Sequence, residues 1–224
     1  MTVEVTLDVF LKGVDLVAST AFLTLRDKMG YRRNLLALSR LDAYGFAIET
    51  EDPDRTVATL KRVLATQSTF YNRNKHNYFL DCRWEGGGTT EGTTPEDYRQ
   101  QLVSQARKTV LAGTKKDFDS TQDVDRVIFK DVPVYRTEVL VEDLDPAAKT
   151  AMARKLEDEL SAARVVVTRL GTCWHLALRA ETDGEAREVT EGIVVTKKRD
   201  RGLLLNPNYQ GHKFLALEQI GLGR

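Results

Sequence analysis

The sequence is poor in the residues from which most metal and thiol sites are built. It has two cysteines, Cys82 and Cys173, and three histidines among 224 residues. The cysteines are too far apart in sequence for a redox or zinc motif, and no two histidines have the i, i+4 spacing of a helical metal site. We therefore expect no bound metal or cofactor, and we interpret both cysteines as small core residues on strands.

An excess of one charge and long apolar runs are also missing. The chain has 33 basic and 33 acidic residues, so its formal net charge is zero. Nucleic-acid binding depends on surplus Lys and Arg, and the basic run Lys197–Arg201 is interpreted as a solvated loop or helix end. No run is long enough to span a membrane, and Met1–Phe10 alternates polar and apolar residues, unlike a signal peptide. We expect a cytoplasmic protein without nucleic-acid or membrane partners.

Two frequent catalytic signatures are absent as well. Gly86–Gly88 is not followed by Lys and then Ser or Thr, and no helix is expected directly after it, so it does not predict a phosphate-binding loop. Carboxylates are frequent, but none form a pair in an apolar setting that would indicate an acid–base dyad. We therefore predict no catalytic residue and no activity of the chain alone.

What the sequence does contain is an internal repeat, in two blocks that recur in the same order. Ser39–Asp52 recurs loosely as Thr168–Glu181, and Phe70–Leu80 recurs as Leu204–Leu215. The aligned residues are Tyr44 with Trp174, Phe46 with Leu176, Ile48 with Leu178, Asn72 with Asn206, Asn74 with Asn208, and Phe79-Leu80 with Phe214-Leu215. This order indicates a duplicated structural unit.

Each half predicts a similar series of strands and helices from apolar periodicity and caps. The first half predicts a strand over Val3–Leu11, a helix capped by Ser19 and ended by Gly30, two strands or one long bent strand over Leu35–Thr50, a helix opened by Asp52-Pro53 with Val57, Leu60 and Leu64 inward, and a strand over Asn77–Trp84. The second half predicts a strand over Arg136–Val141, a helix opened by Asp145-Pro146 with Ala148, Met152, Leu156 and Leu160 inward, strands over Val165–Thr168 and Trp174–Ala180, a helix from Asp183 that is weakened at Gly192–Val195, and a strand over Lys213–Leu217.

The order β-α-β-β-α-β is typical of the ferredoxin-like fold. We predict an α+β protein in which residues 1–84 and 135–224 form two ferredoxin-like repeats, packed as an intramolecular pseudo-dimer. Residues 85–134 are predicted to be a connector that is flexible over Gly86–Thr94. A helix from Pro95 follows, with Tyr98, Leu102, Ala106 and Val110 on its apolar stripe. Helices would cover one face of each sheet, and the other repeat would cover the second face.

The two halves resemble PurS, the small subunit of phosphoribosylformylglycinamidine synthase. The first half carries the resemblance in Val9-Phe-Leu-Lys-Gly-Val14, Met29-Gly-Tyr31 and Arg40–Tyr44, and the second in Arg169-Leu-Gly171 and Leu203-Leu-Leu-Asn-Pro207. The resemblance implies a fused pair of units acting as a non-catalytic assembly subunit in purine biosynthesis. Its implied partners are a PurL-type synthetase and a PurQ-type glutaminase, between which it forms a bridge.

The loops before the last strand of each half are the predicted partner-binding surfaces, because recognition usually involves loops on a rigid scaffold. The candidates are Tyr71, Asn72, Asn74, His76 and Tyr78 in the first loop and Asn206, Asn208, Tyr209 and His212 in the second. The asparagines also suit turns, and His175 is expected to lie in a strand and to pack against a partner. Two alternatives stay open, a small-molecule-sensing module and an enzyme with a site between the repeats that uses His76 or His212. A homo-oligomer is compatible with each of them.

Overall fold

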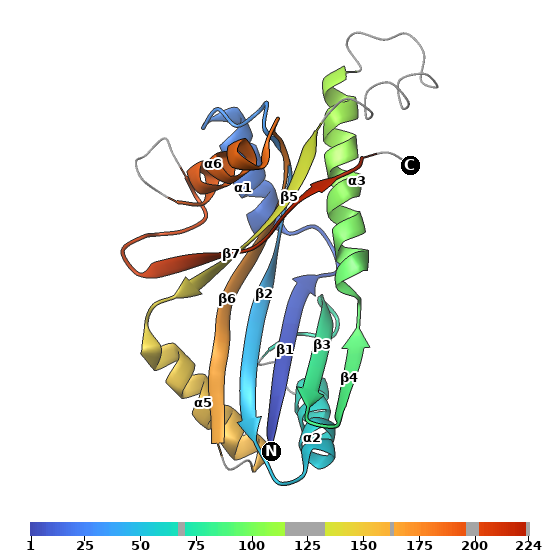
Figure 1. Cartoon of the computed structure of the whole chain (residues 1–224), viewed down its shortest axis with the longest axis vertical. Helices are drawn as coiled ribbons and strands as arrows, with labels where there is room; N and C mark the ends of the chain where they lie inside the picture. Colours follow the sequence, from blue (N-terminus) through green and yellow to red (C-terminus); the bar gives the residue numbers. More distant parts are fainter. Residues whose placement is uncertain (67–69, 115–132, 162–163, 196–201, 223–224) are drawn as a thin grey trace. The chain divides into compact units, whose positions relative to one another are not determined.

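The computed structural model describes residues 1–66, 70–114, 133–161, 164–195 and 202–222, which form an α+β protein (Figure 1). The elements are β1 (Thr2–Leu11), α1 (Leu16–Asp27), β2 (Leu35–Glu49), α2 (Pro53–Thr66), β3 (His76–Trp84), β4 (Gly87–Gly92), α3 (Pro95–Thr114), β5 (Val134–Asp143), α5 (Pro146–Leu160), β6 (Arg164–Arg179), α6 (Asp183–Val194) and β7 (Gln210–Ile220). Within these ranges, no helix combines the length and the apolar character needed to cross a membrane. The basic run Lys197–Arg201 lies outside the described residues.

The strands are hydrogen-bonded in the order β4-β3-β1-β2-β6-β5-β7. β1 pairs antiparallel with β2 and β3, so that Val5 lies opposite Phe46 and Cys82, and β3 pairs antiparallel with β4. Each half of the sequence has the element order β-α-β-α-β, and the strand order of the first half (β3-β1-β2) is mirrored in the second (β6-β5-β7).

β2 is one long strand, which is one of the two forms expected for Leu35–Thr50, and β6 is one long strand where two were predicted, so each half has one strand fewer than the order β-α-β-β-α-β. Asn34 accepts a backbone hydrogen bond from Arg179 at 2.8 Å, and Glu49 is 3.5 Å from Arg164. Gly45 lies between these points, and a Cβ there would be 2.7 Å from the Thr168 hydroxyl oxygen. Gly45 therefore permits the close approach of two continuous strands and does not form a turn.

The chain folds into two compact units whose composition differs from the sequence halves. Unit 1 contains Met1–Val14, Leu41–Pro95 and Glu142–Cys173, and unit 2 contains Asp15–Arg40, Glu96–Val141 and Trp174–Arg224. The division falls inside β2 and β6, so unit 1 includes α5 from the second half and unit 2 includes α1 from the first. The boundaries at residues 84 and 135 describe the sequence repeats and stay a prediction.

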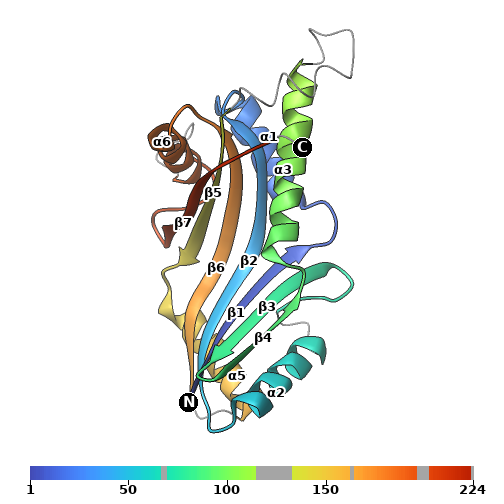
Figure 2. The ribbon, with the colours of Figure 1, turned by 45° about the vertical axis from the view of Figure 1, so that its right-hand side comes forward.

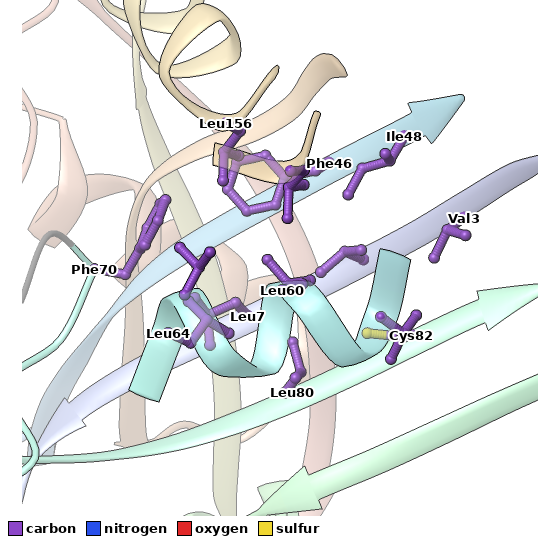
Figure 3. Packing of buried hydrophobic residues seen from close by; sticks show 14 of the residues in the cluster. Val3, Leu7, Phe46, Ile48, Leu60, Leu64, Phe70, Leu80, Cys82 and Leu156 are labelled. Atoms are coloured by element: carbon purple, nitrogen blue, oxygen red, sulfur yellow. The ribbon is translucent and has the colours of Figure 1, made fainter. Parts of the chain in front are cut away.

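The core of unit 1 lies between the inner face of its strands and helices α2 and α5 (Figure 3). Asp52 and Pro53 begin α2 as predicted, with the Asp52 carboxylate accepting from the Arg55 amide at 3.0 Å. The predicted inner residues of α2 are all buried, and so are Leu156 and Leu160 of α5. Ala148 is exposed, because only the part of α5 from Met152 onward reaches the core.

In unit 2, helices cover both faces of the sheet. Helices α1 and α6 pack against alternate residues of β5 and β6, among them Val139 and Leu176. Helix α3 packs against the residues between them, including Val134 and Ala177, and Figure 2 shows α6 and α3 on opposite sides of β6. The four residues of the predicted α3 stripe are all buried. The expected cover of this second face, the other repeat, is wrong for unit 2, because the connector helix buries it.

Two predicted ends and connections differ from the structure. Helix α1 is capped by Asp15 and not by Ser19, since the Asp15 carboxylate accepts from the amides of Val17 and Ala18 at 2.9 and 3.1 Å. The segment expected to be a flexible connector contains β4, because the outer edge of β3 offers backbone groups to pair with. Neither the cap at Asp15 nor the pairing of β4 with β3 is evident from the composition of these segments.

Candidate functional site

The two candidate loops have the same pattern of hydrogen bonds. In the first loop the Asn74 amide donates to the Asn72 side-chain oxygen at 2.9 Å, and the His76 amide donates to the Asn72 carbonyl at 2.8 Å. In the second loop the equivalent bonds join Asn208 to Asn206 at 3.1 Å and Gln210 to Asn206 at 2.9 Å. The asparagines thus form the turns that were predicted for them.

A side chain four residues after each first asparagine closes the loop. The Asn72 amide donates to His76 Nδ1 at 2.9 Å, and the Asn206 amide donates to Gln210 Oε1 at 3.0 Å. Because Nδ1 of neutral His76 is an acceptor, its proton lies on Nε2. His76 is therefore the hydrogen-bonded loop histidine that the sequence indicated, with one ring N–H left for another partner.

Two tyrosines connect the first loop to the core and to β4. Tyr71 is 4% exposed and packs with the unit 1 core, and its ring centroid is 4.7 Å from that of Tyr78. The Tyr78 hydroxyl donates to Glu91, which also pairs with Lys61 at 3.2 Å. Burial and the hydrogen bond to Glu91 raise the pKa of Tyr78, and that hydrogen bond lowers the pKa of Glu91. Tyr71 and Tyr78 thus have packing roles inside the protein.

A groove of about 330 Å³ lies beside these tyrosines. Its lining residues are Lys12, Tyr71, Arg73, His76, Asn77, Tyr78, Gly92 and Thr93. Lys12 ties the end of β1 to the loop, since its ammonium donates to the Arg73 carbonyl at 2.6 Å and its amide donates to Lys75 at 2.9 Å. At Gly92 a Cβ would lie 2.0 Å from the Tyr78 carbonyl oxygen, so glycine is required where β4 meets β3.

Four residues that the sequence did not predict lie beside the candidate residues: Lys12, Arg73, Gly92 and Thr93. Lys12 follows the first strand, and Gly92 and Thr93 belong to a segment interpreted as a flexible connector. The pairing of β1 and β4 with β3 brings them together. The alternation of the first strand predicted where β1 ends and therefore where Lys12 lies. No sequence pattern predicted that β4 pairs with β3.

The second loop differs in its side chains. Tyr209 is 57% exposed, and its hydroxyl accepts from the Asn206 side-chain amide at 2.7 Å. His212 has Nε2 3.6 Å from a Glu191 carboxylate oxygen on α6. The structure brings the four candidate residues of this loop together and adds Gln210, which was not among the predicted residues.

A buried group of charges forms a separate site in unit 2. Arg136 is 2% exposed, pairs with Glu138 and donates from Nε to Glu218 at 2.8 Å. His175 is also buried, with Nδ1 3.4 Å from Glu138, and its ring packs edge-on against Tyr98. Burial favours the neutral carboxyl of Glu138, but His175, Arg136 and Arg99 outweigh it and lower its pKa to about 2.

This charge group is suited to holding β5 beneath α3, because its members neutralise one another. It contains no nucleophile next to a base. Both cysteines are buried on strands, as predicted, and neither is in a disulfide; burial raises the pKa of the Cys82 thiol to about 11. Within the described ranges, no three His, Cys, Asp or Glu side chains are grouped so that they could hold a metal ion.

No protein-family model matches the chain, and no curated protein or solved structure shows significant similarity to it. The PurS resemblance therefore depends on the sequence motifs alone.

Proposed function

We propose that the chain is a non-catalytic assembly subunit related to PurS, formed by two fused units, that bridges a PurL-type synthetase and a PurQ-type glutaminase in purine biosynthesis. The observation that supports this proposal is the shared hydrogen bonding of the loops at Asn72 and Asn206. Two loops with one conformation, each leading into the last strand of a half, are what a duplicated unit would retain. PurS-type subunits act as pairs of such units.

The strand order adds support for a fused pair. Two β-α-β-α-β units that pair through their second strands, β2 and β6, would give the order β3-β1-β2-β6-β5-β7. Strand β4 is added at one edge. In this proposal each predicted ferredoxin-like repeat becomes a repeat of three strands. Helix α1 of the first repeat lies in compact unit 2, and helix α5 of the second repeat lies in compact unit 1. The segment Leu203–Pro207, which carries the resemblance in the second half, leads into β7.

Partner binding would involve the exposed side chains of the loops. Tyr209 is the strongest candidate, because a large exposed aromatic residue on a rigid loop is a frequent binding hot spot. Tyr71 is a useful comparison, since it is an aromatic residue next to the first loop that is buried. With zero net charge, long-range attraction contributes little to association, and local apolar and hydrogen-bonding contacts must supply the affinity.

Co-purification tests the proposal. The chain is expressed with a PurL-type synthetase and a PurQ-type glutaminase, and the complex is followed by size-exclusion chromatography. We expect wild type to form a complex at micromolar concentration, and Tyr209→Ala to weaken it about tenfold or more without changing the thermal unfolding midpoint. Tyr71→Ala should lower the midpoint. If wild type binds neither partner, or if Tyr209→Ala binds as well as wild type, the proposal fails.

The chain alone should not turn over formylglycinamide ribonucleotide with ATP and glutamine. The described residues provide no phosphate-binding loop and no activated nucleophile. Product formation by the isolated chain, free of contaminating synthetase, would contradict the non-catalytic role.

A further inference from the structure

The second loop is an internal control for the first, because the two share a backbone but differ in chemistry. The second loop has Gln210 where the first has His76, and it has Pro207 where the first has Arg73. Lys12 follows β1, and the residue that follows β5 is Leu144. Gln210 supplies the acceptor that His76 supplies in the first loop, so the turn itself does not require a basic side chain at any of these three positions.

Lys12, Arg73 and His76 retain unused donors. Lys12 donates to the Arg73 carbonyl, which leaves two of the three ammonium protons for another acceptor. His76 uses Nδ1 within the loop and keeps the Nε2 proton. Arg73 is exposed, and neither it nor Lys12 forms an ion pair with a carboxylate among the described residues.

The groove has no acidic lining residue in the described part of the chain. Glu91, the residue before Gly92, is engaged by the Tyr78 hydroxyl and by Lys61, and the charge of Arg73 also contributes to lowering its pKa. A local surplus of positive charge thus remains on a chain whose total charge is zero. Such a surplus attracts an anion.

The shape of the groove restricts the anion. A volume of about 330 Å³ is at the small end of ligand sites. Cationic groups come from the end of β1 and from the loop, and Asn77 and Thr93 add polar groups from β3 and from the segment after β4. Donors from several directions suit a tetrahedral phosphate better than a planar carboxylate. The ring of Tyr78, tilted by 30° against the buried ring of Tyr71, adds an apolar surface for the body of the ligand.

We propose that the groove at Lys12, Arg73 and His76 binds the phosphate group of a small molecule, whose ring or other apolar part lies against Tyr71 and Tyr78. This site does not depend on the proposed assembly role. The isolated chain should bind such a ligand whether or not a synthetase binds the chain.

Matched probes test the proposal by isothermal titration calorimetry on the isolated full chain. The probes are phenyl phosphate, benzoate, which keeps the ring and changes the anion, and inorganic phosphate, which keeps the anion and removes the ring. We expect phenyl phosphate to bind most tightly, and its binding to weaken with added salt. Equal binding of benzoate would overturn the choice of phosphate, and absence of phenyl phosphate binding would overturn the site.

Loop-exchange variants locate the site. His76→Gln and Arg73→Pro introduce the residues of the second loop, so the loop should keep its conformation and its unfolding midpoint. We expect each to weaken phenyl phosphate binding about tenfold. Gln210→His in the second loop is the matched control and should leave binding unchanged. If the double variant His76→Gln/Arg73→Pro is folded and binds as well as wild type, the groove is not the site.

Discussion

Strands β1 and β5 occupy the same place in the two halves, yet β1 is buried on one face and β5 on both. Each has ten residues, and position by position Glu4 corresponds to Arg136 and Thr6 to Glu138. Glu4 is exposed, whereas Arg136 is fully buried beneath α3. A polar side chain on a strand therefore needs hydrogen-bond or ion-pair partners within the protein only where another element covers it. In unit 2 this element is α3.

The largest effect should follow the loss of Arg136. Arg136→Met leaves Glu138 buried with fewer counter-charges, and removing one partner of a buried ion pair costs about 3–5 kcal/mol of unfolding free energy. Urea unfolding measures the loss. Glu4→Met, at the corresponding exposed position of β1, should change stability by less than about 0.5 kcal/mol. Equal effects at the two positions would remove the distinction between the strands.

Truncation of α3 should have the next largest effect. Leu102 is fully buried between α3 and the second face of the unit 2 sheet, so Leu102→Ala should cost about 3 kcal/mol through lost contacts and a cavity. Gln101→Ala, on the exposed side of the same helix, is the control and should have little effect in the same urea experiment. A small loss at Leu102 would mean that α3 does not hold β5.

Low pH should destabilise β5 and not β1, because only β5 carries the buried carboxylate of Glu138. Its pKa is about 2 in the folded protein and 4.5 ordinarily, so its stabilising contribution is complete above about pH 4.5 and is lost as pH falls toward 2. Comparing wild type with Glu138→Gln by urea unfolding between pH 6 and pH 2.5 should show a difference that shrinks by about 2 kcal/mol. Parallel curves for the two proteins would contradict the charge network.

The smallest effect concerns the core-facing side of β5. Thr137 corresponds to Val5 of β1 and is fully buried, with its hydroxyl oxygen 3.2 Å from that of Thr190. Thr190→Val should cost about 1 kcal/mol, because the Thr137 hydroxyl loses its partner. Adding Thr137→Val gives β5 the valine of β1 and should recover part of the loss in thermal unfolding. A further loss in the double variant would show that the hydroxyl pair itself is not the cause.

Apolar periodicity predicted those parts of the fold that depend on neighbouring residues. The stripe of α3 from Tyr98 to Val110 and the inner residues of α2 are buried as expected, because the spacing of a helix is a local property. The strand over Val3–Leu11 follows from alternation in the same way. Cysteine burial was also predicted correctly.

The rest of the fold depends on partners that are remote in sequence. Arg136 and Glu138 alternate with apolar residues as an exposed strand face would, and only the packing of α3 makes that face internal. The candidate loops were located by the repeat, but Lys12 joins the groove through strand pairing. The apolar spacing of α1 and α5 does not predict against which strands these helices pack.

The division of β2 and β6 between the compact units also bears on synthesis by the ribosome. Unit 1 needs residues up to Cys173, so its strands β1 to β3 are made well before α5 can cover them. At about 5–20 residues per second, the stretch from residue 96 to residue 173 takes roughly 4–16 s to translate. During that interval part of the apolar face around Phe46 is without its final cover, and the nascent chain must stay soluble, alone or with a chaperone, until its second half arrives.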